Sequence, residues 1–201
     1  LQRSEGLLKD AQRIARMGSW TWDVKTNAVA WSDGLCLIHG LEPGEFDGRF
    51  DTAVSLIHPD DLAEVRQMIQ GLLDDKQPSD CEYRICTRDG IVKHVRSDQE
   101  LFLDDDGNVV RMHGTLQDIT ARKLVEQQLQ EAEADLKHTV EVVPSIIAKV
   151  DAHTGRFIHC NPALTRILGF SSEEFLARPF TDFVHPDDRE RSLSEVEEQF
   201  K

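Results

Sequence analysis

Apolar side chains repeat with helical spacing over one long stretch of this chain. No glycine or proline interrupts the sequence from Asp118 to Val143, and apolar or small residues follow in alternating steps of four and three. These positions are Val125, Leu129, Ala132, Leu136, Thr139 and Val143. The spacing is typical of a coiled-coil seam and predicts a helix over 120–143 that pairs with a second copy of the chain. The alternative is a single amphipathic helix lying on its own domain.

Alternation of apolar and polar residues with period two predicts five strands. The first two, at 19–23 and 29–31, are joined by a turn in which Asn27 can take the left-handed conformation. Turns that contain glycine separate the other three. These three runs cover residues 81–87, 91–103 and 109–118. Strands joined in this way predict one antiparallel sheet.

Helical patterns precede and interrupt the predicted strands. Residues 1–17 have an apolar face that ends near Gly18, where glycine suits a helix C-cap. Residues 32–48 contain short helical or irregular pieces. The HPDD sequence at 58–61 predicts the start of a longer helix, with Pro59 in its first turn and two aspartates at the positive end of its dipole. Helices on one face of an antiparallel sheet define an α+β fold.

The order of these patterns begins again in the second half of the chain. The matching pairs are 22–27 with 150–155, 38–41 with 167–170, and 56–61 with 183–188. Three ordered matches at a nearly constant offset indicate two copies of one module. The predicted parts are an N-terminal helix at 1–17, a first module at 18–119, a connecting helix at 120–143 and half of a second module at 144–201. Because that half lacks the last three strands, we expect the natural chain to continue beyond Lys201.

Charge and cysteine content narrow the possible partners. The chain has 37 acidic and 23 basic residues, and its net charge of -14 opposes binding to phosphate backbones and anionic lipid. We therefore expect no nucleic-acid partner and no direct membrane contact. The four cysteines form no CxxC pair, which favours a cytoplasmic location. No apolar run is long enough to span a bilayer, although a parent protein could carry an anchor elsewhere.

Candidate chemistry is sparse. The histidine and aspartates of HPDD could bind a metal ion, but no second histidine or acidic cluster stands at ligand spacing, so a helix start explains the motif better. Residues 104–108 lack the full calcium-loop pattern and predict a hairpin turn. Gly114 in the last strand indicates a close backbone approach or a bulge. With no catalytic triad and no glycine-rich phosphate loop, we expect no catalytic or metal-binding residues in this segment.

With this order and repeat, the sequence resembles the PAS family of sensor domains, with a PAC motif ending the first copy. The matching stretches are GSWTWDVKTNAVAWSDGLCLIHGLEP, HPDD, EYRICTRDG, DDDGNVV and GTLQDIT, and in copy two IHCNPALTRILGF and FVHPDD. The resemblance implies a five-stranded antiparallel sheet flanked by helices around a small pocket. It also implies the input region of a bacterial signalling protein, such as a histidine kinase, diguanylate cyclase or phosphodiesterase. Asp118, Ile119 and Thr120 match the motif at which such domains pass a signal to the next helix.

The resemblance also implies a pocket inside the first copy. The candidate lining residues are Trp20, Trp22, Trp31, Ile38, Ile57, Val65, Ile69, Met112 and Leu116. The tryptophans could equally be core residues. Flavin-binding relatives have a cysteine motif that is missing here, and Leu116 stands where they have a flavin-contacting glutamine. Haem-binding relatives have a histidine within the main helix, whereas this chain has only His58 before it. Neither haem nor a covalent flavin adduct is expected, and the cofactor is unknown.

These patterns predict a homodimeric sensory module without enzymatic activity of its own. It would detect a small ligand or cellular signal and pass it through the connecting helix to a C-terminal effector beyond Lys201. One alternative is a ligand-free scaffold for dimerisation or protein interaction. Another is an enzyme that uses HPDD as a metal site.

Overall fold

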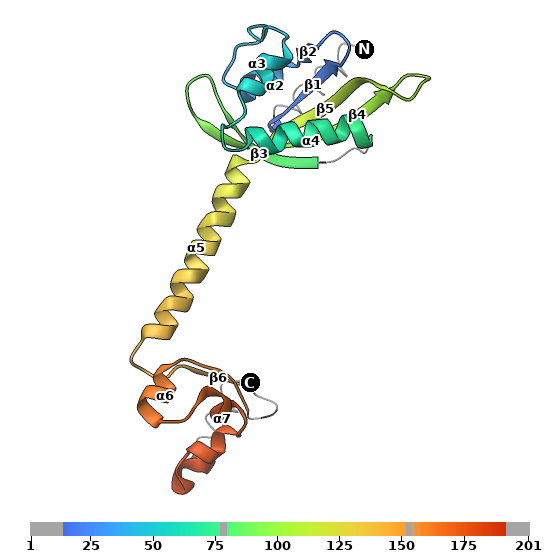
Figure 1. Cartoon of the computed structure of the whole chain (residues 1–201). Coiled ribbons are helices and arrows are strands. Elements are labelled where there is room, and N and C mark those ends of the chain that lie inside the picture. Colours follow the sequence, from blue (N-terminus) through green and yellow to red (C-terminus); the bar gives the residue numbers. More distant parts are fainter. Residues whose placement is uncertain (1–13, 77–79, 152–153, 155, 192–201) are drawn as a thin grey trace. The chain divides into compact units, whose positions relative to one another are not determined.

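The computed structural model describes residues 14–76, 80–151, 154 and 156–191 (Figure 1). The chain divides into two compact units between Glu126 and Gln127. Most of the predicted N-terminal helix, residues 1–13, lies outside the described residues. The prediction that Gly18 caps this helix is wrong, because Gly18 lies inside the first strand and Arg16 takes the left-handed conformation with φ of 50°.

The first unit is built on a five-stranded antiparallel sheet in the order β2-β1-β5-β4-β3. Its strands are β1 Met17–Asp23, β2 Ala28–Trp31, β3 Asp80–Cys86, β4 Val92–Leu103 and β5 Val109–Asp118. The predicted sheet is confirmed, and each strand ends within two residues of its predicted limits. In the first turn Asn27 has the expected positive φ of 59°.

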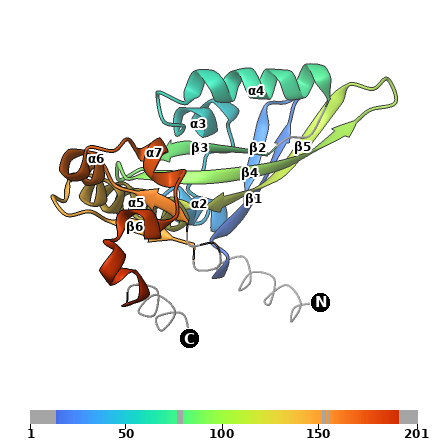
Figure 2. The same cartoon turned by 90° about the horizontal axis from the view of Figure 1, so that it is seen from below.

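In the described part of the first unit three helices accompany the sheet, and α4 lies over one face of it (Figure 2). They are α2 Asp33–Ile38, α3 Phe50–Ser55 and α4 Leu62–Asp75. Leu72 of α4 is buried against Trp22, Val29 and Met112 of the sheet, and this contact explains the apolar stripe of the helix. The α+β class is confirmed. Helix α3 was not distinguished from the loops around it in the sequence.

The HPDD motif has a different structural role from the one predicted. Helix α4 begins at Leu62, so Pro59 does not lie in its first turn. The Asp61 carboxylate instead accepts hydrogen bonds from the backbone N and Nε of Arg84 on β3, at 2.8 and 3.0 Å. The backbone N–H of His58 donates to the Arg84 carbonyl at 2.8 Å. The hydrogen bonds from the side chain and backbone of Arg84 lower the pKa of Asp61, and the motif therefore fastens the start of α4 to the sheet.

Two glycines allow elements of the first unit to pack unusually closely. A Cβ atom on Gly114 would lie 2.5 Å from the carbonyl oxygen of Asp98 and 2.6 Å from the Trp20 ring, which confirms the predicted close approach. A Cβ atom on Gly18 would lie 2.4 Å from the backbone nitrogen of Leu35 in α2. Contacts this short leave no room for a side chain.

The second unit repeats the beginning of the first. Its elements are β6 Ala148–Val150, β7 Phe157–Cys160, α6 Ala163–Leu168, α7 Ser172–Leu176, η1 Phe180–Phe183 and η2 Pro186–Asp188. Strands β6 and β7 pair in antiparallel fashion, as β1 and β2 do. Asp151 Oδ1 accepts a hydrogen bond from the Thr154 backbone N–H at 2.9 Å, and Asp23 and Thr26 form the same bond at the same distance. The repeat therefore extends to individual turn contacts.

Helix α5, Thr120–Val142, joins the two units as one uninterrupted helix. None of its residues, all of which the structure describes, is buried. This exposure contradicts the alternative of an amphipathic helix lying on its own domain. At its C-terminal end, the Asn161 side chain donates to the carbonyls of Val140 and Ser145 at 2.8 and 3.0 Å, which fastens the last turn of α5 to the second unit.

Candidate functional site

The first unit contains a cavity of about 110 Å³ between the sheet and helices α2, α3 and α4. Eight of the nine predicted lining residues surround it: Trp20, Trp22, Trp31, Ile57, Val65, Ile69, Met112 and Leu116. Ile38 does not, because α2 directs Leu35 and His39, four residues apart, towards the cavity. Ile38 packs instead in the core with Ile85 and Val95. The tryptophans thus belong both to the core and to the cavity wall.

Polar residues that the sequence reasoning missed also line the cavity. They are His39, Tyr83, Ser97 and Gln99. Ser97 and Gln99 are buried on β4, where Ser97 Oγ donates to Gln99 Oε1 at 3.2 Å. The sequence of β4 could have indicated this, because Ser97 and Gln99 follow the buried Val95 in steps of two, and residues two apart in a strand lie on the same face of the sheet. Polar residues at these positions belong to the inner face of the sheet.

His39 is an uncharged polar group in the cavity wall. Its side chain is buried, and its ring packs on Trp31 with centroids 4.3 Å apart. Nδ1 lies 3.0 Å from the Leu35 carbonyl oxygen, so Nδ1 must carry the hydrogen of this bond. Burial, opposed by this bond and reinforced by the charge of Lys93, lowers the pKa of His39 to about 4. At neutral pH the ring is therefore neutral, and Nε2 is a hydrogen-bond acceptor.

The predicted relay residues form the junction between β5 and α5. Ile119 is buried, and its backbone N–H donates to the His94 carbonyl at 2.9 Å. Asp118 Oδ1 accepts a hydrogen bond from the Thr120 backbone N–H at 3.0 Å, which satisfies one of the free N–H groups at the start of α5. Thr120 Oγ1 in turn accepts from the His94 backbone N–H at 3.0 Å. The first turn of α5 is thus held directly by β4 and β5.

Lys93 connects this junction to α2, the helix that carries the cavity-lining residue Leu35. Its Nζ donates to the carbonyl oxygen of Ile38, the last residue of α2, at 2.7 Å. The same Nζ lies 3.7 Å from Asp118 Oδ2. Burial opposes ionisation of Asp118, but the hydrogen bonds from Thr120 and the charge of Lys93 outweigh it and lower the pKa of this carboxyl. One ammonium group therefore contacts both the helix that carries Leu35 and the motif that begins α5.

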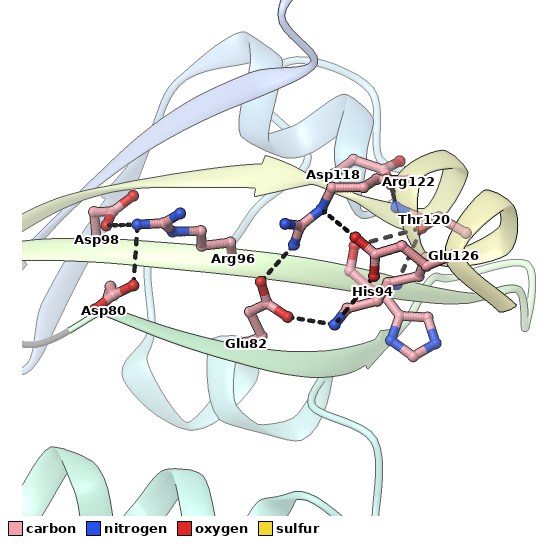
Figure 3. Close-up of polar contacts among 10 residues, drawn as sticks. Asp80, Glu82, His94, Arg96, Asp98, Asp118, Thr120, Arg122 and Glu126 are labelled. Atoms are coloured by element: carbon pink, nitrogen blue, oxygen red, sulfur yellow. Dashed lines mark hydrogen bonds and ion pairs between the residues drawn. The ribbon is translucent and has the colours of Figure 1, made fainter. Parts of the chain in front are cut away.

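Ion pairs across the outer face of the sheet add to the junction. Figure 3 shows Glu82 of β3 directed towards Arg122 in the first turn of α5. Glu82 also pairs with Lys123 at 2.6 Å. Farther along the sheet, Arg96 pairs with Asp80 at 3.0 Å (Figure 3). Because these groups are partly solvated, each pair contributes at most about 1 kcal/mol.

The described part of the chain contains neither a candidate metal site nor a candidate membrane-spanning helix. Within residues 14–76, 80–151, 154 and 156–191, no group of three or more histidine, cysteine, aspartate or glutamate side chains could hold a metal ion. Over the same ranges, no helix has the length and apolar character that crossing a bilayer requires.

The fold and its cavity place the first unit among small α+β domains, and comparison with known proteins identifies the family. A family model described as "PAS fold" matches residues 28–116 and 157–201, so it covers both copies of the repeat. The chain belongs to the PAS family. A sensory box histidine kinase/response regulator from Burkholderia thailandensis E264 has a similar structure, with 30% identity and a TM-score of 0.56. That match covers 65% of this chain and 98% of the other.

Curated relatives are signalling proteins much longer than this chain. The chain is 23% identical over 175 residues to the probable diguanylate cyclase DgcE of Escherichia coli, and the match covers 87% of this chain and 16% of the cyclase. It is 25% identical over 180 residues to the sensor protein FixL of Bradyrhizobium diazoefficiens, with coverage of 90% and 35%. The chain thus spans about a third or less of these relatives.

Proposed function

We propose that this chain is a sensory PAS module that detects a small ligand or cellular signal in the cavity of its first unit. It forms a homodimer and passes the signal through α5 to an effector domain of a longer protein. The relative named as a diguanylate cyclase and the similar structure named as a histidine kinase support an effector of the cyclase or kinase type. We also propose that the protein lies in the cytoplasm. The segment itself has a sensory and not a catalytic role.

One observation carries the proposal: Lys93 contacts both α2, the helix that carries the cavity-lining Leu35, and the start of α5. A ligand that shifts α2 would move the Ile38 carbonyl, and with it the ammonium group that is paired with Asp118. The buried Ile119 and the Thr120 contacts with His94 then carry the change into the first turn of the helix. A short chain of direct contacts of this kind is a physical route for coupling between two sites.

Homodimerisation is supported by the exposed stripe on α5. Val125, Leu129 and Leu136 of the predicted seam are 63%, 59% and 66% exposed in the single chain. Ala132 is also exposed, and Val143 follows the last helical residue. Exposed leucine and valine at alternating steps of four and three match a second copy of the same helix.

Leu129→Asp is expected to convert the dimer to monomer. Dimerisation would bury an unpaired carboxylate from each chain, which we expect to weaken the dimer roughly 100-fold. Sedimentation velocity of the 201-residue chain at micromolar concentration measures this as a fall from the mass of two chains to that of one. The control is Leu124→Asp, which places the same charge at a residue that is 55% exposed but lies off the seam. Equal masses for wild type and Leu129→Asp would refute the seam.

Lys93→Met is expected to loosen the first turn of α5. It removes the charged hydrogen bond to Ile38 and the partner of Asp118, so the Thr120 and Lys123 amides should exchange with deuterium about tenfold faster. The control is Lys25→Met, because Lys25 also pairs with an aspartate, Asp104, at 3.7 Å but lies at a hairpin.

A double-mutant cycle separates coupling from simple destabilisation. Leu35→Val disturbs the wall of the cavity and should raise exchange at Thr120 when Lys93 is present. In the Lys93→Met background the same change should have no further effect at Thr120. Equal effects of Leu35→Val in both backgrounds would show that Lys93 transmits nothing, and the proposed route would fail.

A further inference from the structure

The wall of the first-unit cavity carries no formal charge. Among the described residues that line it, none is aspartate, glutamate, lysine or arginine, and the one histidine, His39, is held neutral. Four aromatic residues, Trp20, Trp22, Trp31 and Phe50, belong to the wall together with aliphatic side chains. An ion that entered would lose its hydration and find no opposite charge, which is strongly unfavourable. The cavity therefore selects against charged molecules.

One side of the cavity nevertheless offers hydrogen bonds. Ser97 and Gln99 of β4 are 3% and 7% exposed, and Tyr83 of the neighbouring β3 lines the same space. Burial raises the pKa of Tyr83, which keeps its phenol protonated and uncharged. Buried hydroxyl and amide groups are retained only where hydrogen bonds compensate for their lost hydration. These groups form a polar strip on an otherwise apolar wall.

His39, the residue that follows α2, supplies a hydrogen-bond acceptor in the cavity wall. Since Nδ1 donates to the Leu35 carbonyl, Nε2 keeps its lone pair and can accept a hydrogen bond. The cavity thus combines an acceptor that cannot donate with hydroxyl and amide groups that can do both. A hydroxyl group is the smallest ligand group that can use both kinds.

The volume sets the size of the occupant. A cavity of about 150 Å³ lined by apolar side chains holds benzene. The cavity here, at about 110 Å³, has room for roughly one six-membered ring once its walls adjust slightly. Flavin and haem are far larger than this space.

We propose that the first-unit cavity binds an uncharged, mostly apolar molecule of about one ring that carries a single hydroxyl group, with phenol as the simplest example. The aromatic walls hold the ring, and the hydroxyl bonds to the strip of Tyr83, Ser97 and Gln99 or to His39. This proposal rests on the proposed sensory function, because it names the chemical class of ligand for the same cavity.

Three probes of similar shape test the class: phenol, toluene and benzoate. Toluene replaces the hydroxyl with a methyl group, and benzoate adds a negative charge. Titration of the 201-residue chain at pH 7, followed by tryptophan fluorescence and calorimetry, should give the tightest binding for phenol. Toluene should bind about tenfold more weakly because it lacks the hydrogen bond. Benzoate should bind at least 100-fold more weakly, and benzoate binding equal to that of phenol would overturn the proposal.

Two variants assign any binding to the cavity. Gln99→Leu removes part of the polar strip and should reduce or reverse the preference for phenol over toluene. Ala53→Leu adds volume at the cavity wall and should abolish binding of both. Since each variant tests the site separately, failure of one to fold leaves the other informative. Phenol binding that is unchanged in the folded variants would place it elsewhere and overturn the proposal.

Failure of the ligand class and failure of the sensory function give different results. If none of the three probes binds, or only benzoate does, the proposed ligand class is wrong. The sensory function survives that result if another molecule, found by native mass spectrometry of the purified chain, changes deuterium exchange at Thr120. It fails if a molecule fills the cavity and exchange at Thr120 stays the same.

Discussion

Gly18→Ala is expected to destabilise the first unit by about 3 kcal/mol, close to the upper end for a single overpacked site. The added Cβ would lie 2.4 to 2.6 Å from the backbone nitrogen, Cα and Cβ of Leu35, and a backbone cannot move aside as a flexible side chain can. Strand β1 would have to separate from α2, which carries part of the cavity wall. Thermal unfolding followed by tryptophan fluorescence should show a midpoint lower by roughly 10 °C.

Tryptophan fluorescence reports the unfolding of the first unit alone, because all three tryptophans lie at positions 20–31 in that unit. Gly71→Ala is the matched control. Gly71 lies in α4, and an added Cβ would meet nothing nearer than an Asp75 oxygen at 4.0 Å. Alanine at this helical position should stabilise the unit by about 0.5–1 kcal/mol. If the thermal unfolding midpoint of Gly18→Ala equalled that of the wild type, β1 and α2 would not be in contact at this point.

The sheet could be predicted because its strands are half-buried. One face of each strand meets the helices, so apolar residues must alternate, and the turns between strands need residues such as Asn27 that tolerate positive φ. Helix α5 was predictable for a related reason: its apolar residues follow one another in steps of four and three over its whole length, without an interrupting glycine or proline. Helix α3 has only six residues, and no side chain caps its start, so it leaves almost no periodic signal.

The contacts that give the site its character depend on residues far apart in the sequence. Lys93 reaches a carbonyl 55 positions away, and Arg84 binds Asp61 across 23 positions. Periodicity along a single chain reports which side of an element is buried, but not which group it meets there. The same limit explains Ile38: in a six-residue helix, the face turned to the cavity is set by tertiary packing of Leu35 and His39. The polar strip was missed because serine and glutamine normally indicate an exposed face.

His39 is expected to make the first unit sensitive to mild acid. Its pKa is lowered to about 4 in the fold, chiefly by burial, against an ordinary value of 6.5. Below pH 6.5 the His39 side chain binds a proton in the unfolded chain but not in the folded chain. The contribution of this residue to the free energy of unfolding is therefore fully present above pH 6.5 and falls as the pH drops towards 4. The full loss is about 3 kcal/mol by proton linkage. Urea unfolding between pH 7 and 4.5, followed by tryptophan fluorescence, measures it.

His39→Leu should flatten this dependence, and the second copy already has a leucine, Leu168, at the matching position. The variant also loses the hydrogen bond to Leu35, but that loss lowers the free energy of unfolding equally at every pH. The test is therefore the slope of the free energy of unfolding against pH, and not its absolute value. His159→Gln, at an exposed site in the second unit, should keep the wild-type slope. Lys93 is the charged neighbour that lowers the pKa of His39, so Lys93→Met should make the slope shallower without abolishing it. An acid dependence in His39→Leu as steep as that of wild type would show that other groups, and not this buried imidazole, are responsible.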